Sequence, residues 1–119
     1  MKFALCNEVF QHLSLEDGFS RIAEIGYQGV EIAPFTLKEN PLEIEENDAD
    51  RCIETAKSAG IEIVGLHWLM AKTEGLHLTH PDEGMRSAAC EYLKKLTLLT
   101  ARRGGNIICL LYTSDAADE

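Results

Sequence analysis

The sequence lacks long hydrophobic runs. No apolar stretch approaches the roughly 20 residues of a transmembrane helix. The apolar stretch after Met1 is interrupted by Asn7 and Glu8 before it reaches the length of a signal peptide. Positive charge is also scarce, with 11 Lys and Arg against 20 Asp and Glu and a net charge of −9. Because there is no basic cluster to follow a phosphate backbone, we expect a cytoplasmic protein that binds neither nucleic acids nor membranes.

Several short motifs that define common catalytic sites are also missing. No G-x-G-x-x-G follows the first predicted strand, and neither a phosphate-binding G-x-x-x-x-G-K-S/T loop, a nucleophile elbow nor an H-E-x-x-H motif occurs. No two of the four cysteines have C-x-x-C spacing, which argues against a zinc knuckle and a thioredoxin-type site. We interpret Cys6, Cys52 and Cys90 as small buried thiols rather than as disulfide partners.

What the sequence does contain is a repeated unit of a short apolar strand followed by an amphipathic helix. Apolar patterns predict strands at 2–6, 29–33 and 61–66, and a fourth strand opening at 106–108. Apolar residues at helical spacing lie between these strands. Residues suited to begin and end the three helices are Ser14 with Gly26, Asn47 or Asp48 with Gly60, and Asp82 with Gly104 and Gly105.

The order of these elements predicts an α/β fold with parallel strands and right-handed crossovers. It does not by itself separate a barrel from an open doubly wound sheet, although the missing glycine motifs argue against a nucleotide-binding sheet. At 119 residues the chain is one domain at most, whereas a complete (β/α)₈ barrel needs roughly 250 residues. We expect loops after the first strand and at 70–81, the second of them rich in polar residues.

Polar side chains stand at the ends of the predicted strands, where parallel α/β folds place their sites. Glu31 faces away from Val30 and Ile32, and a carboxylate on that side needs a cation, a donor or water unless it is an edge residue facing solvent. His67 can bind a metal, transfer a proton or donate to a substrate, or it can be a partly buried structural imidazole. Trp68 can form the wall for a sugar ring or cap the core.

Four further polar residues are candidates for ligand or metal contacts. Asn7 and Glu8 follow the first strand and can touch a ligand bound at its end. His77 and His80 have a spacing that suits a metal on a helix, but they lie in a predicted loop beside a proline.

Several segments of the sequence resemble the xylose isomerase-like TIM barrels. Residues 25–32 (Ile-Gly-Tyr-Gln-Gly-Val-Glu-Ile) resemble the passage from the first helix to the second strand of that superfamily, and residues 59–68 resemble its third strand. Residues 74–79 and 103–108 add to the similarity with the sugar phosphate isomerase and epimerase branch. The resemblance implies an α/β fold in which residues 1–108 form a partial (β/α)₈ TIM barrel, namely the first three β/α units and the start of strand 4.

The resemblance also implies a site. Glu31 matches the second-strand glutamate of the family, and His67 matches a position where the endonuclease branch has a metal-binding histidine. For the isomerase and epimerase branch we expect Glu31, His67, Trp68 and Asn7 to contact a small sugar or sugar phosphate. The family uses a divalent metal, commonly Mn, Mg or Co, whose ligands are expected after residue 108. We therefore expect this chain to hold no metal ligand, His67 being the one candidate for such a role.

The last residues resemble no barrel segment. Residues 109–119 look like a translated sequencing adapter, so we expect the native sequence to end near Ile108. The predicted parent is a metal-dependent sugar or sugar-phosphate isomerase or epimerase, which can also form an oligomer. The fragment alone is expected to be inactive. The alternatives are an endonuclease IV-like DNA repair enzyme, which the acidity disfavours, a sugar-acid dehydratase on the same scaffold, and a non-catalytic ligand-binding barrel without the later metal ligands.

Overall fold

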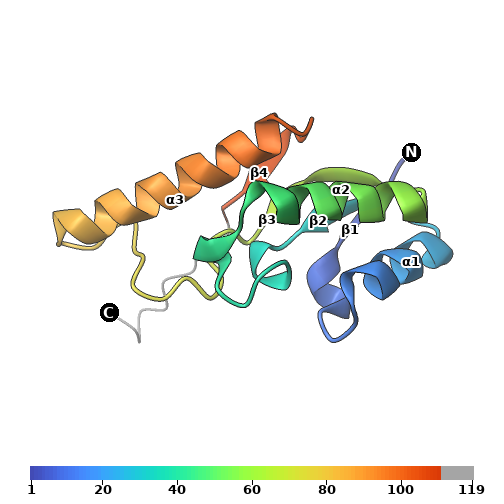
Figure 1. Cartoon of the computed structure of the whole chain (residues 1–119), viewed down its shortest axis with the longest axis horizontal. Coiled ribbons are helices and arrows are strands. Elements are labelled where there is room, and N and C mark those ends of the chain that lie inside the picture. The colour runs from blue at the N-terminus through green and yellow to red at the C-terminus, as the bar shows by residue number, and fades with distance from the viewer. Residues whose placement is uncertain (111–119) are drawn as a thin grey trace.

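Four parallel strands form one sheet in the computed structural model, which describes residues 1–110 (Figure 1). The strands are β1 (Ala4–Cys6), β2 (Gly29–Ile32), β3 (Glu62–His67) and β4 (Ile107–Cys109). The helices are α1 (Leu15–Ile25), α2 (Glu46–Ala59) and α3 (Glu83–Ala101). Three short 3₁₀ turns complete this part of the chain, η1 (Asn7–Phe10), η2 (Pro34–Thr36) and η3 (Pro41–Glu43).

The strand order follows the sequence, β1-β2-β3-β4, and each neighbouring pair is parallel. A doubly wound nucleotide-binding sheet reverses its strand order at a switch point, whereas a (β/α) barrel adds each strand beside the last. The observed order is therefore that of part of a barrel, which confirms the predicted fold class.

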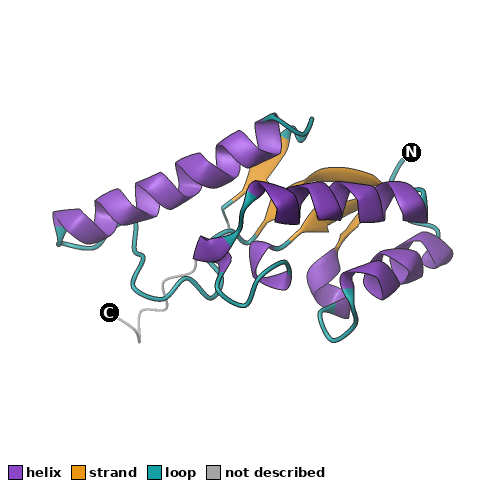
Figure 2. Ribbon diagram, viewed as in Figure 1, coloured by secondary structure: helices purple, strands orange, loops and turns teal. Residues whose placement is uncertain are grey.

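The helices pack on one face of the sheet. One apolar cluster joins Phe19 of α1 and Cys52 of α2 to Val30 and Ile32 of β2. Figure 1 shows α2 lying across the sheet, with α1 on one side of it and α3 on the other, and Figure 2 shows the strands behind these helices. Because successive strand residues point to opposite faces, Glu31, between Val30 and Ile32, faces away from the helices.

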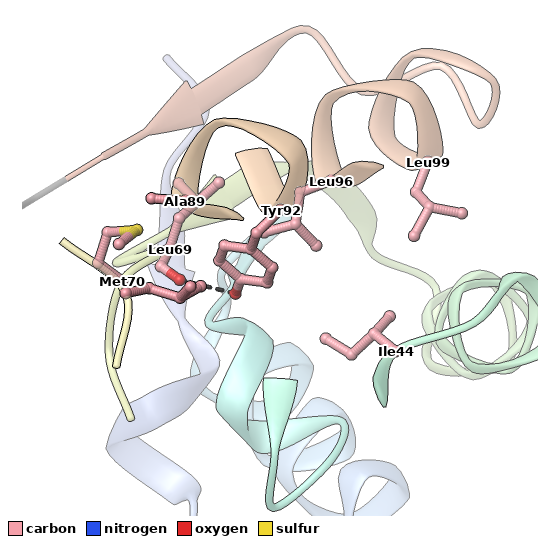
Figure 3. Close-up of a cluster of buried hydrophobic side chains, with 8 residues drawn as sticks. Ile44, Leu69, Met70, Ala89, Tyr92, Leu96 and Leu99 are labelled. Atoms are coloured by element: carbon pink, nitrogen blue, oxygen red, sulfur yellow. Dashed lines mark hydrogen bonds between the residues drawn. The ribbon is translucent and has the colours of Figure 1, made fainter. Parts of the chain in front are cut away.

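A second apolar cluster holds α3 against the segment that follows β3 (Figure 3). Leu69 is fully buried there beside Tyr92 and Leu96. The Tyr92 hydroxyl donates a 2.7 Å hydrogen bond to the carbonyl oxygen of Leu69. The loop predicted at 70–81 is present, but it is not simply polar, because Met70 and Leu76 are buried under α3.

Most predicted helix ends are confirmed. The Ser14 hydroxyl accepts from the Asp17 amide, the Asp82 carboxylate accepts from the Met85 amide, and Gly26 adopts a left-handed conformation at the end of α1. The N-cap of α2 was predicted wrongly as Asn47 or Asp48. It is Glu45, because the Asp48 side chain reaches back to the Glu45 amide and forms a capping box. The last helix ends at Ala101, before the two glycines.

Two further predictions need correction. Asn7 and Glu8 do not begin a loop but the 3₁₀ turn η1. Cys6, Cys52 and Cys90 are free thiols, as expected, yet only Cys52 is buried, whereas Cys6 is half-buried and Cys90 is exposed. Among residues 1–110, no helix combines the length and apolar character that crossing a bilayer requires. The proposed adapter tail lies outside the described residues from position 111 onward.

Candidate functional site

The carboxyl ends of β1, β2 and β3 bring an imidazole between two carboxylates. His67 Nδ1 lies 3.6 Å from Glu31 Oε2, and His67 Nε2 lies 3.9 Å from Glu8 Oε1. The side chains of His67, Glu31 and Glu8 are 22%, 30% and 28% exposed, respectively, so the group is partly buried but reachable from solvent. Glu31, His67 and Glu8, all three predicted as candidates, therefore meet at one end of the sheet.

A bulge in β3 explains how His67 reaches this face. Val30 pairs with Ile63, but Glu31 pairs with Gly65, so Val64 is an extra residue. In a regular pairing Glu31 would oppose Val64, and His67 would then point to the helix-covered face. The extra residue shifts the alternation by one and turns His67 toward Glu31. Sequence reasoning missed this bulge, although the glycine inside the strand was a signal for it.

Asn7, next to Glu8 in the sequence, links the end of β1 to the segment that follows β2. Its side-chain oxygen accepts from the Ala33 amide at 2.9 Å, and its nitrogen donates to the Thr36 hydroxyl oxygen at 2.7 Å. The Thr36 hydroxyl in turn donates to the Ala33 carbonyl. Asn7 is only 5% exposed, so its amide faces protein partners rather than solvent.

Trp68 follows His67 directly and turns the chain away from the sheet. Its φ of 55° lies in the left-handed region, which is rare for a bulky residue. The indole packs edge-on against Phe35, with ring centroids 5.7 Å apart, and the Lys72 ammonium lies 4.6 Å from the Phe35 ring centroid. Trp68 and Cys6 pack against the same small apolar cluster. The Trp68–Phe35 pair therefore lies next to Glu8, Glu31 and His67, which we call the polar group.

Cys6 joins the polar group as well. One ligand atom each from Cys6, Glu8 and His67 lie within 4.8 Å of one another. Burial, together with the negative charges of Glu8 and Glu31, raises the pKa of the Cys6 thiol to about 11. Sequence reasoning gave this residue a packing role only, because an apolar strand with one thiol carries no motif.

His77 and His80 do not take part in this group. They lie before α3 with ring centroids 5.9 Å apart, and His80 Nδ1 accepts from the Asp82 amide.

The donor set can be compared with the divalent metal that the family resemblance implies. Mg²⁺ prefers six oxygen ligands, and Mn²⁺ also suits carboxylates and water rather than thiols. The group in residues 1–110 instead mixes sulfur, nitrogen and oxygen. It therefore does not fit Mg²⁺ or Mn²⁺, although it suits Co²⁺. Because the resemblance implies that the ligands of the family metal come after residue 108, no catalytic step through that metal follows from these residues.

A comparison with solved structures supports the fold assigned from the strand order. No protein-family model and no curated protein matches the sequence. Among solved structures the chain is similar to D-psicose 3-epimerase, crystallised in the presence of D-fructose, with a TM-score of 0.64 and 14% sequence identity. The match covers 99% of this chain and 43% of the epimerase chain, so our chain spans less than half of that length. At this identity the likeness establishes the partial barrel fold.

Proposed function

We propose that this chain is the amino-terminal part of a metal-dependent sugar or sugar-phosphate isomerase or epimerase. The observation that carries the proposal is the group of Glu8, Glu31 and His67 at the carboxyl ends of the strands, where barrel enzymes place their active sites. The likeness in fold to an epimerase supports the reaction class.

The proposed ligand is a small polyhydroxylated molecule. Carboxylates accept hydrogen bonds from sugar hydroxyls, and the imidazole can donate one or accept one. Trp68, held against Phe35, offers an aromatic wall beside these groups. Asn7 is proposed to act through the backbone of β1 and η2, since its own amide is engaged by Ala33 and Thr36.

The remaining catalytic groups are assigned to sequence beyond this chain. Isomerisation and epimerisation next to a carbonyl move a proton and build negative charge on oxygen, which a divalent metal stabilises when bound. Mn, Mg or Co is expected in that role, with ligands after residue 108. The present chain is proposed to contribute scaffold and substrate contacts, and residues 109–119 are proposed to be non-native.

A longer protein that contains residues 1–108 tests this function. It should convert at least one ketose or ketose phosphate in a panel, and a chelator should abolish the conversion. Glu31→Gln and His67→Gln should each lower kcat/KM at least about tenfold, since each removes a hydrogen-bonding charge or ring at the substrate.

Glu62→Gln is the matched control, because this exposed carboxylate lies at the opposite end of β3. It should leave kcat/KM unchanged. Undiminished turnover in both the Glu31 and His67 variants would reject the proposed site. A longer protein that binds sugars but converts none would instead indicate a non-catalytic barrel.

A further inference from the structure

The group at the carboxyl end of the sheet contains three metal-ligating residue types from two strand ends. We propose that Cys6, Glu8 and His67 bind a borderline transition-metal ion, Zn²⁺ foremost, in a site separate from the metal of the proposed isomerase. Glu8 and His67 also belong to the group proposed to contact the sugar, but neither the ion nor Cys6 as its ligand follows from that function. The metal titration below uses no sugar and measures no turnover, so its failure would leave the proposed function standing.

The spacing of the ligand atoms suits a small ion. Zinc bonds of about 2.3 Å to sulfur and about 2.1 Å to nitrogen or oxygen place tetrahedral ligands about 3.4 to 3.6 Å apart. Here the three atoms lie within 4.8 Å of one another, and His67 Nε2 and Glu8 Oε1 are 3.9 Å apart. That separation is too long for a hydrogen bond, and small side-chain rotations would bring the atoms to ligand distance.

The other imidazole nitrogen faces a carboxylate, the type of group to which metal-binding histidines often donate. Glu31 Oε2 lies 3.6 Å from His67 Nδ1, so a small side-chain rotation would bring it to hydrogen-bond distance and hold the ring with Nε2 toward the ion. The two carboxylates also supply negative charge that favours a cation.

The backbone around the ligands is fixed. Cys6 and Glu8 flank Asn7, whose side chain is anchored to Ala33 and Thr36. The β3 bulge sets the direction of His67. Rigid supporting contacts of this kind reduce the ordering cost of binding.

The donor set selects the ion. A thiolate, an imidazole and a carboxylate suit Zn²⁺ or Co²⁺ better than Mg²⁺. Three protein ligands leave a fourth position for water or a substrate oxygen, in keeping with the partial exposure of Glu8 and His67. On binding, the Cys6 thiol releases its proton to solvent and the sulfur donates an electron pair to the metal.

Titration of the reduced 119-residue chain with Co²⁺ tests the site. One equivalent should produce the charge-transfer absorption of a cobalt–thiolate bond, and Zn²⁺ should displace it. Cys6→Ser should abolish this absorption, whereas Cys90→Ser, at an exposed cysteine, should keep it. His67→Gln and Glu8→Gln should weaken binding at least tenfold, and Glu31→Gln should weaken it about 10- to 100-fold while the absorption persists.

A second measurement needs no variant and so does not depend on refolding. Zn²⁺ should slow alkylation of Cys6 in the native chain, read by mass spectrometry, while alkylation of Cys90 stays unchanged. Equal alkylation of Cys6 with and without Zn²⁺ overturns the proposal. So does cobalt–thiolate absorption that survives in Cys6→Ser, or one that disappears only when His77 and His80 are replaced.

Discussion

Glu31 Oε2 and His67 Nδ1 lie 3.6 Å apart on one face of the sheet, although regular pairing of their strands would place them on opposite faces. The bulge at Val64 makes the difference. Gly65, which follows it, lies so close to β4 that a Cβ atom there would overlap the carbonyl oxygen of Ile107. The same two residues therefore orient His67 and admit the fourth strand.

Gly65→Ala should loosen β4. Because the added methyl would overlap the Ile107 backbone, we expect a loss of about 1–3 kcal/mol in the free energy of unfolding, as for other overpacked positions. Amide exchange in β4 should accelerate. Gly18→Ala is the control: its added Cβ meets Phe10 Cβ at an ordinary 3.5 Å, and in helix α1 it should stabilise by up to about 1 kcal/mol. Equal effects of both substitutions would contradict the role given to Gly65.

Asn7→Ala should destabilise the chain by about 1–3 kcal/mol, since the Ala33 amide loses its buried acceptor. Asn7→Asp keeps an acceptor for that amide but cannot donate to Thr36, so a smaller loss is expected. Urea unfolding measures both variants, with Thr36→Val reporting the hydroxyl separately. A loss below about 0.5 kcal/mol in Asn7→Ala, within the range of ordinary surface substitutions, would argue against this link between β1 and β2.

Stability should fall in alkaline solution. Burial raises the pKa of Cys52 from 9.0 to about 12 and raises that of Tyr92 as well. The unfolded chain therefore loses these protons at lower pH than the folded chain, so their contribution is complete below pH 9 and is lost as the pH rises toward 12. Melting curves at pH 7, 9 and 11 measure the effect.

Tyr92→Phe separates the tyrosine's share of this pH dependence. It should lower stability at pH 7 by about 1 kcal/mol, because the Leu69 carbonyl loses its donor. It should also make the alkaline decline shallower. A decline as steep as that of the parent chain would show that Tyr92 does not contribute.

The edges of the sheet should promote self-association. Within residues 1–110, β1 and β4 each pair with only one strand. Phe3, just before β1, is 59% exposed, and Ile107, the first residue of β4, is 48% exposed. Unpaired apolar edges favour pairing with another chain. Light scattering after gel filtration should detect oligomers that Ile107→Lys reduces, whereas Leu98→Lys, at an exposed position of α3, should not. A clean monomer with a sharp, cooperative melt would contradict this expectation.

Local chemistry made much of the fold predictable. Ser14, Asp82, Gly26 and Gly60 mark helix ends because each satisfies backbone groups or adopts a left-handed turn within a few residues. Asp48 misled the prediction because a carboxylate at the third helical position resembles an N-cap when its partner Glu45 is ignored.

The polar group was only partly predictable, because it depends on pairing between distant segments. Glu31 and His67 were found from their places at strand ends. Their shared face depends on the bulge at Val64, which was not predicted although the glycine inside the strand was a signal for it. In the structure Ile63 and Leu66, three residues apart, both pack against the helix-side cluster. Cys6 could not be assigned from sequence, because its orientation depends on pairing with Glu31 in the neighbouring strand.

Helices and polar residues occupy opposite sides of the same thin layer of strands. Mutations in the outer surfaces of α1, α2 and α3 are thus screened from Cys6, Glu31 and His67 by a row of buried aliphatic residues. Substitutions on the outer surfaces of the helices are therefore expected to leave the side chains at the strand ends undisturbed. This separation would allow the helical sequence to diverge while the path of the backbone is kept.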